Sequence, residues 1–90
     1  MRETEKELEK VLKALANRRR LAIVTVLKRS SHMPVGDIAE KIKLSFKATS
    51  KHLSILASAE LIDREQQGLL MRYYLAKDIP SFVRALIKAL

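Results

Sequence analysis

The hydrophobic period of the sequence changes twice along the chain, and this change limits the fold more than any other feature. Up to about residue 59, apolar residues recur at the spacings of three and four that place them on one face of a helix. From Ile62 to Leu75 the period is two, as in a strand, and from Ile79 the helical spacing returns. The pattern predicts a mainly α protein in which one β-hairpin interrupts a series of helices.

Four helices are predicted before the hairpin. They cover residues 4–16, 17–29, 35–42 and 45–59, with a loop at residues 30–34. Asn17 and Ser45 are good N-caps for the second and fourth helices, because their side chains accept hydrogen bonds from free backbone N–H groups. The second helix is apolar on most sides and should be central. The third and fourth are joined by a tight connection in a basic region, which predicts helix-turn-helix geometry.

The hairpin and a last helix complete the predicted elements. The strands are expected at residues 62–66 and 70–75, joined by a turn at Gln67 and Gly68. Alternation along the second strand places Tyr73 in the core and leaves Tyr74 half-buried on the hairpin. Asp78 is expected to cap the last helix, which tolerates Pro80 in its first turn.

The length of 90 residues allows one domain, which we place at residues 1–90. A domain of this size buries only about 60% of the surface of its unfolded chain, so its stability is marginal without added support. The chain has no cysteine and hence no disulfide, which leaves association with a second copy. The last helix carries six apolar residues, more than one small core covers, and this excess predicts an interface.

The charge of the chain indicates a polyanion as partner. Eighteen basic and ten acidic residues give a net charge of +8, and nine basic against three acidic residues at positions 17–60 give that segment +6. Such a basic segment is the electrostatic footprint of a nucleic-acid-binding protein. No apolar run is long enough to span a membrane and no secretory signal opens the sequence, so we expect a cytoplasmic protein.

The predicted fourth helix divides its residues between two sides. At 100° per residue, the side expected to face the core holds Phe46, Thr49, Leu53, Leu56 and Ala57. The opposite side presents Lys47, Ala48, Lys51, Ile55 and Ser58, with Ser45, Ser50 and His52 on its flanks. Long cations and small hydroxyl groups suit a helix in the DNA major groove, since the cations reach guanine N7 and O6. A simple solvated surface explains the same composition, and composition alone does not separate the two.

Several short segments of the chain form one ordered set of motifs. They are Ala14 to Asn17 with Arg20 and Leu21, Val35 to Ala39, Leu44 and Ser45 with Ser50 to Leu53, and Gly68 with Tyr73 and Leu75. In these motifs the chain resembles the ArsR/SmtB family of winged-helix repressors over about residues 8–90. The resemblance implies a winged helix-turn-helix with five helices and one hairpin, the wing. It also implies a symmetric dimer interface formed by the first and last helices.

The resemblance further implies which residues contact DNA. Base contacts are implied for Lys47, Ala48, Ser50 and Lys51, and phosphate contacts for Ser45, His52 and the wing-tip residues Gln66, Gln67 and Leu69. Phe46 also falls on a base-contacting position of the family. The helical wheel turns it toward the edge of the core, so we do not include it in the predicted site.

Two departures from the family pattern bear on structure. Glu60 stands where the family usually has glycine, at a helix end where φ is expected to be positive, which predicts modest strain or a shifted cap. Leu69 and Leu70 stand at the wing tip, where basic residues are common in the family. They weaken the grip of the wing on phosphates or mark a contact with a hydrophobic partner.

The metal sites of the family are not matched. Pro34 and Gly36 occupy the positions of its Cys-x-Cys segment, and the last helix has no Asp, Glu or His for its second site. The two histidines, His32 and His52, do not have metal-ligand spacing. We therefore expect no metal and no cofactor. His32 is expected to be an exposed loop residue, and His52 either a phosphate contact or a hydrogen-bonded side chain on the flank of its helix.

These features predict a homodimer that binds double-stranded DNA at a roughly palindromic site and represses transcription. The alternative is a winged helix that docks on another protein, but such a module has no need of the +6 segment. No enzyme is expected. Asp37 and Glu40 lie one turn apart like an acid–base pair, yet on a short surface helix they fit solvation or the helix dipole better.

Overall fold

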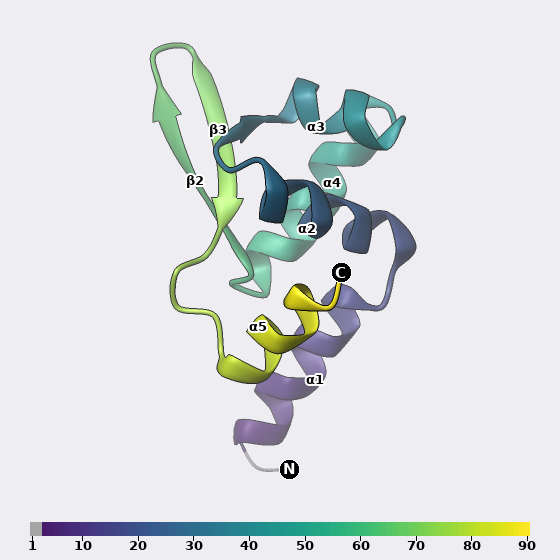
Figure 1. The fold of residues 1–90 in the computed structure, drawn as a ribbon, viewed down its shortest axis with the longest axis vertical. Coiled ribbons are helices and arrows are strands. Elements are labelled where there is room, and N and C mark those ends of the chain that lie inside the picture. Colours follow the sequence, from purple (N-terminus) through teal and green to yellow (C-terminus); the bar gives the residue numbers. More distant parts are fainter. Residues whose placement is uncertain (1–2) are drawn as a thin grey trace.

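The computed structural model describes residues 3–90 and shows a winged helix-turn-helix (Figure 1). The elements are α1 (Glu3–Leu15), α2 (Arg18–Arg29), β1 (Met33–Pro34), α3 (Val35–Ile42), α4 (Phe46–Ser58), β2 (Ile62–Gln67), β3 (Leu70–Leu75) and α5 (Ser81–Lys88). The predicted fold class and the order of the helices and the hairpin are confirmed. Residues 1 and 2 of the predicted domain lie outside the described residues.

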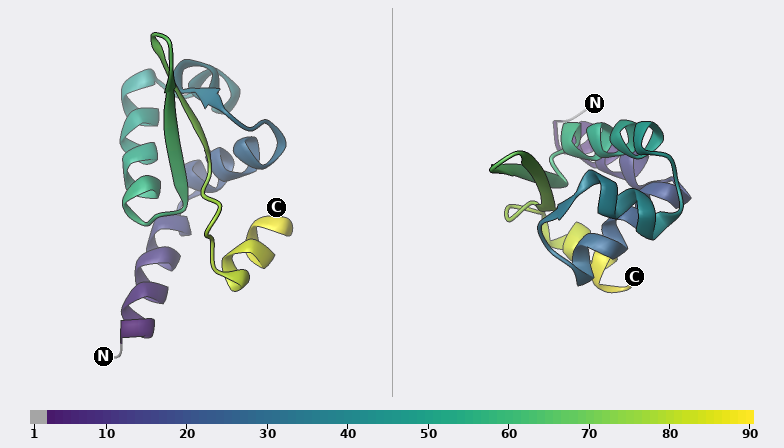
Figure 2. Two further views of the ribbon diagram at one scale, coloured as in Figure 1. Left: turned by 90° about the vertical axis from the view of Figure 1, so that its left-hand side faces the viewer. Right: turned by 90° about the horizontal axis from the view of Figure 1, so that it is seen from above.

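The molecule is elongated, with extents of 41 × 25 × 22 Å. The wing, formed by β2 and β3, projects at one end of the long axis, and α1 begins at the other end (Figures 1 and 2). The long α4 contacts β2 at the base of the wing, and from there α4 and the wing diverge toward the same end of the long axis (Figures 1 and 2). This arrangement separates the first turn of α4 and the wing tip from the start of α1 and from α5.

The core lies between the helices and the base of the hairpin. Ile23 and Val24 of α2 are fully buried, which confirms that α2 is the central helix. They pack in one cluster with Ile38 of α3, Leu53 of α4 and Val83 of α5. Because every helix contributes to the same cluster, the orientation of α4 is fixed by the core behind it.

Local signals place the ends of the helices as predicted. The Asn17 side chain accepts hydrogen bonds from the N–H groups of Arg19 and Arg20 at 2.9 and 3.1 Å, and Ser45 accepts one from the N–H of Ala48 at 3.1 Å. Both predicted N-caps are therefore confirmed. They fix where the chain turns into α2 and α4.

Glu60 has φ of 60°, which confirms the positive φ predicted after α4. Its N–H donates to the carbonyl of Ala57 at 2.9 Å, and the N–H of Leu61 donates to that of Leu56 at 3.1 Å. These two hydrogen bonds form a Schellman motif, which stabilises a left-handed residue even without glycine. Lys43, with φ of 56°, ends α3 in the same way and makes the tight turn before α4.

The sheet contains one strand that the sequence did not predict. Residues 30–34 were expected to be a loop, but Met33 and Pro34 form β1, which pairs antiparallel with β3 in the order β1-β3-β2. The turn of the hairpin also differs, because β2 continues to Gln67 and the turn lies at Gly68 and Leu69. The pairing of Gln67 with Leu70 leaves two residues between the strands, and the φ of 63° at Gly68 suits such a tight turn.

The prediction that Asp78 caps the last helix is wrong. The helix α5 begins at Ser81, its N-cap is Pro80, and no side chain caps it. The carbonyl of Pro80 accepts the first hydrogen bonds, from the N–H groups of Val83 and Arg84. A residue before proline is restricted to extended conformations, so the helix cannot begin at residue 79 and Asp78 is too far from its first turn.

Candidate nucleic-acid interface

The predicted DNA-contacting residues of α4 lie on its outer side. We call this group the α4 surface; its members are Ser45, Lys47, Ala48, Ser50, Lys51 and His52. Ser45, Lys47 and Lys51 are exposed, and the others are partly buried. Their side of the helix lies opposite the buried Thr49 and Leu53, so the fold leaves most of their polar atoms accessible.

The helical wheel misplaced residues at both ends of α4. Phe46 was expected at the edge of the core but is 61% exposed, and Ala57 is exposed as well. Both lie at ends of the helix that extend past the buried centre at Thr49, Leu53 and Leu56. Phe46 therefore belongs to the exposed surface of the first turn, where sequence analysis had left it out.

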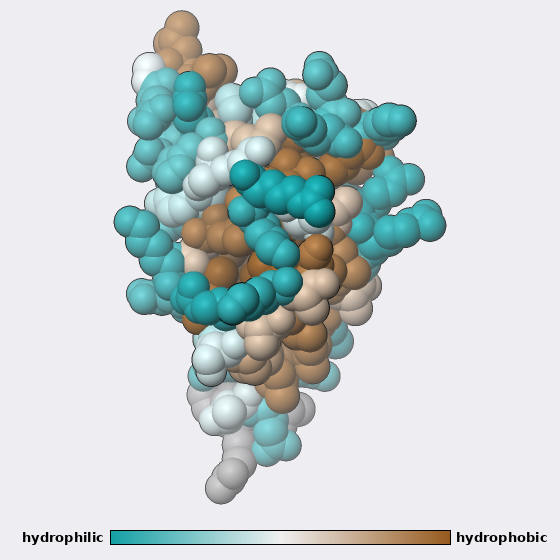
Figure 3. Space-filling view, viewed as in Figure 1, coloured by the Kyte–Doolittle hydropathy of each residue, from teal (hydrophilic) through white to brown (hydrophobic). Residues whose placement is uncertain are grey.

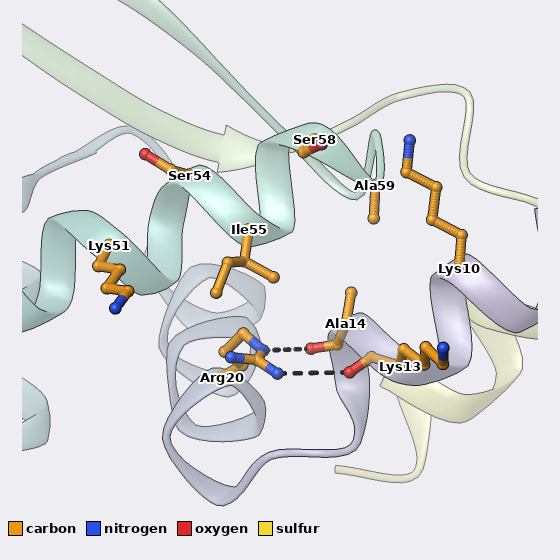
Figure 4. A pocket seen from close by; sticks show the side chains of 9 residues that line it. All are labelled: Lys10, Lys13, Ala14, Arg20, Lys51, Ser54, Ile55, Ser58 and Ala59. Carbon is orange, nitrogen blue, oxygen red and sulfur yellow. Dashed lines mark hydrogen bonds between the residues drawn. The ribbon is translucent and has the colours of Figure 1, made fainter.

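Ile55 was expected on the outer side but packs against the core. The reason is that α1 lies across the second half of α4, where a groove of about 470 Å³ separates the two helices (Figure 4). Its lining residues are Lys10, Lys13, Ala14, Arg20, Lys51, Ser54, Ile55, Ser58 and Ala59. A helical wheel for α4 alone cannot include this packing partner. The groove joins lysines of α1 to the basic surface of α4.

Arg20 holds the end of α1 beside α4, a role that sequence analysis missed. Its Nε donates a hydrogen bond to the carbonyl of Ala14 at 2.6 Å, and its Nη2 donates to that of Lys13 at 3.3 Å (Figure 4). The same guanidinium places Nη1 3.3 Å from Nδ1 of His52. Since a guanidinium only donates, Nδ1 accepts this hydrogen bond and the ring proton is on Nε2. One signal for this role was present in the sequence. Arg20 lies in the first turn after the N-cap Asn17, and this turn directly follows α1.

The surroundings of His52 disfavour its protonated form. Burial lowers the pKa of His52 below its usual value of 6.5, and the nearby charges of Arg20, Arg19 and Lys51 lower it further. The ring is therefore neutral at pH 7. Both roles predicted for His52 are compatible with this geometry, because Nδ1 is held by Arg20 and the Nε2–H remains to donate.

The wing carries the other predicted residues, Gln66, Gln67 and Leu69, all exposed. The Gln66 amide donates to the carbonyl of Gly68 at 3.3 Å, and the Gln67 amide donates to Oε1 of Glu65 at 3.0 Å. These hydrogen bonds hold the two amides close to the strands. They lie on a different element from the α4 surface, at the same end of the molecule (Figure 1).

The base of the wing is held by the segment before α3. The ring of His32 stacks on that of Tyr74 with centroids 4.6 Å apart, and Nε2 of His32 lies 3.8 Å from Oε1 of Glu65. His32 is exposed, as predicted, and Tyr74 is partly buried, as predicted. Tyr73 is only partly buried but packs against the core. This contact and the β1–β3 pairing fix the direction in which the wing projects.

The comparisons with known proteins decide the family. The sequence profile described as "Bacterial regulatory protein, arsR family" matches residues 17–64, from the N-cap of α2 into β2. The chain belongs to this arsR family. The transcriptional repressor SdpR of Bacillus subtilis is 37% identical over 68 residues, 76% of this chain and 74% of SdpR. The transcriptional activator HlyU of Vibrio cholerae is 32% identical over 80 residues, 89% of this chain and 70% of HlyU.

Solved structures of arsR-type regulators have the same fold. HlyU from Vibrio cholerae matches with a TM-score of 0.84 at 29% identity, covering 99% of this chain and 92% of HlyU. The homodimeric winged helix-turn-helix DNA-binding domain of Mb0332 from Mycobacterium bovis also has a TM-score of 0.84. Its identity is 28%, and the match covers 96% of this chain and 79% of that domain. These matches include α1 and α5, which lie outside the segment matched by the family profile.

Within residues 3–90, no group of three or more His, Cys, Asp or Glu side chains is placed to hold a metal ion. Pro34 and Gly36 lie at the start of α3 without ligand atoms, so the family's metal sites do not fit these residues. None of the described helices has the length and apolar character needed to cross a membrane.

Proposed function

We propose that this protein is a transcriptional regulator that binds double-stranded DNA as a homodimer, with α4 in the major groove. The observation that carries the proposal is the contrast between the two sides of α4. One side is buried in the core at Thr49, Leu53 and Leu56, and the other presents the α4 surface to solvent. An α-helix fits the major groove, and this one is held rigidly with its cationic side outward.

Each member of the α4 surface has a role in this proposal. Lys47 and Lys51 reach guanine N7 and O6, while Ala48 and Ser50 are small enough to let the helix approach the bases. Ser45 already accepts a hydrogen bond from the N–H of Ala48, so its hydroxyl hydrogen is free for a phosphate. The Nε2–H of His52 serves a phosphate in the same way, and Gln66 and Gln67 contact the backbone from the wing.

The homodimer is proposed to form through α1 and α5. Both helices leave large apolar side chains exposed, which we call the α1/α5 patch: Leu8, Leu12, Phe82, Leu86 and Leu90. A symmetric pair covering these patches presents two copies of α4, and two half-sites about 34 Å apart match one turn of DNA. The homodimeric Mb0332 domain supports this assembly, since its fold matches α1 and α5 as well.

The proposal also covers the direction of regulation, the extent of the domain and the location. We assign residues 1–90 to one DNA-binding domain that works in the cytoplasm, where bacterial DNA is found. We favour repression because occupancy of a promoter by a dimer blocks transcription without any further contact. SdpR is a repressor and HlyU an activator, so the family does not fix the direction. The members of the family are transcriptional regulators rather than enzymes.

Selection of bound sequences from a random duplex DNA pool tests this function. We expect enrichment of an inverted repeat with half-sites about 10 base pairs apart, because the two α4 helices are related by a two-fold axis. The matched control is the double variant Lys47→Ala and Lys51→Ala, which keeps the core intact and should lose the enrichment. If the unaltered protein enriches no sequence, the chain is a protein-docking winged helix and the proposal is wrong.

A further inference from the structure

The tip of the wing carries an apolar side chain that nothing in the chain covers. Leu69 is 100% exposed and Leu70 is 49% exposed. Leu69 occupies the second position of the turn after Gly68, whose positive φ leads the chain around. Turn positions are usually filled by polar residues or glycine. A fully exposed leucine there makes no packing contact that stabilises the fold, which leaves its side chain available to another molecule.

The surroundings of Leu69 favour DNA as that molecule. The tip lies at the same end of the long axis as the first turn of α4, and the two elements diverge from the base of β2, where the end of α4 contacts that strand (Figures 1 and 2). Figure 3 shows the apolar tip separated from the rest of the apolar surface by hydrophilic side chains of the wing. With α4 in the major groove, a hairpin that diverges from it toward the same end of the molecule reaches the neighbouring minor groove.

The charge of the wing indicates how it would hold DNA. Residues 62–75 carry two basic side chains, Arg64 and Arg72, and two acidic ones, Asp63 and Glu65, for a net charge of zero. A neutral wing gains little from attraction to phosphates. Its hold on DNA therefore depends less on charge than on direct contacts, and an exposed leucine and two amides are suited to such contacts.

We propose that Leu69 inserts into the minor groove beside each half-site and partly unstacks one base step. Leucine is among the apolar wedges that proteins place between base steps, and glutamine contacts the A·T acceptors of the minor groove. Gln66 and Gln67 precede the turn, and each amide keeps a second N–H that can donate to these acceptors. This inference rests on the proposed DNA binding and adds a second region of sequence preference to it.

A protein partner fits the tip less well. A specific protein interface buries about 800 Å² on each side around a central apolar cluster. The wing offers one fully exposed leucine and a second that is half exposed, on strands lined by charged and amide side chains. The larger apolar surface of this molecule is the α1/α5 patch, at the opposite end.

Base unstacking is the direct test, with 2-aminopurine placed in turn at the steps that flank a half-site selected by the unaltered protein. Its fluorescence should rise at one flanking step when the protein binds. Leu69→Ala should abolish the rise and weaken binding by about three- to ten-fold, while Leu69→Met, which keeps an apolar wedge, should restore both. Ser81→Ala alters an exposed residue at the other end of the molecule, outside the α1/α5 patch, and should leave the fluorescence rise unchanged.

Parallel selections with the unaltered protein and Leu69→Ala give a second measurement. We expect flexible pyrimidine–purine steps, TA or CA/TG, to be enriched at a fixed distance outside each half-site only when Leu69 is present. The half-sites contacted by α4 should be the same in both selections.

The outcomes separate this inference from the proposed function. If the unaltered protein binds its selected site without a change in fluorescence, and Leu69→Ala selects the same flanks, the wedge is wrong and the proposed function stands. If no duplex is selected at all, the proposed function fails and the wedge fails with it. Equal loss of fluorescence in Leu69→Ala and Ser81→Ala would also contradict a wedge at the tip.

Discussion

The two ends of this molecule are exposed to solvent in opposite ways. The end with α4 presents lysines and small polar residues, while the α1/α5 patch presents leucines and a phenylalanine. One core supports both, since α4, α1 and α5 all contribute to the same buried cluster. The difference shows that exposure alone does not tell what a surface binds. The chemistry of the exposed side chains does: cationic and polar groups suit a polyanion, whereas apolar groups suit association with a second copy of the chain.

The helices at the two ends also differ in how they use their apolar residues. In α4 the apolar residues of the central turns are almost all buried, so its outer side is polar. In α5, Val83 and Ile87 are buried while Phe82 and Leu86 on the same broad face remain exposed. The excess in α5 is a second apolar stripe beside the first. In the proposed homodimer, a second copy of the chain covers that stripe without disturbing the core.

Raising the salt concentration should weaken DNA binding at the α4 end far more than it weakens dimer association at the α1/α5 patch. If the dimer makes roughly six or more phosphate contacts, its DNA affinity should fall by about 1,000-fold between 50 and 200 mM salt, because bound cations release counterions from DNA. Association through the apolar patch should change little over the same range. Fluorescence anisotropy with labelled duplex, and sedimentation of the protein alone, measure the two. A flat salt profile for DNA would contradict the proposed role of the lysines.

A charge in the apolar patch should have the next largest effect. Leu86→Glu should weaken the dimer by about 100-fold or more, because association would bury an unpaired carboxylate. The side chain of Leu86 is half exposed in the monomer, so the fold should persist and circular dichroism should be unchanged. Ser81→Glu is the matched control, since it places the same charge on α5 at an exposed position outside the patch. Sedimentation showing a dimer for Leu86→Glu would rule out this interface.

Within the α4 end, base contacts should be separable from phosphate contacts. Lys51→Ala should cost on the order of 1 to 3 kcal/mol on the selected site and relax the base preference there. His52→Ala should weaken binding to selected and scrambled duplexes by about the same factor, because it removes only a phosphate contact. The two variants are compared on both duplexes at one salt concentration. An equal loss on both duplexes for Lys51→Ala would make Lys51 a phosphate contact as well.

Much of the fold could be predicted because its signals are local. The N-caps Asn17 and Ser45 lie directly before their helices, and the positive φ at Glu60 follows from its place after α4. The strand β1 could not be predicted in this way. Met33 and Pro34 have no alternation of their own, and their conformation depends on pairing with β3, about 40 residues further along the chain.

For the candidate site, the sequence predicted only the side-chain directions that follow from the period of α4 itself. The outward direction of Lys47 and Lys51 follows from the period of α4. The burial of Ile55 does not, because it depends on α1 lying across the helix. The contact between Arg20 and His52 joins residues 32 positions apart, so no spacing in the sequence indicated it.

The smallest expected effect concerns pH, and it joins the stability of the core to the α4 surface through His52. The pKa of His52 is lowered in the folded protein, by burial first and then by Arg20, Arg19 and Lys51. The unfolded chain therefore binds this proton more readily, so the contribution of His52 to stability is present above pH 6.5 and is lost as the pH falls through the lowered pKa. A DNA phosphate beside the ring favours the protonated form, so DNA affinity should rise by about two- to five-fold over the same fall in pH. His52→Gln should flatten both trends, as measured by thermal unfolding and by anisotropy between pH 8 and 5.5. If both slopes persist in His52→Gln, another group carries the pH dependence and the assigned position of His52 beside phosphate loses its support.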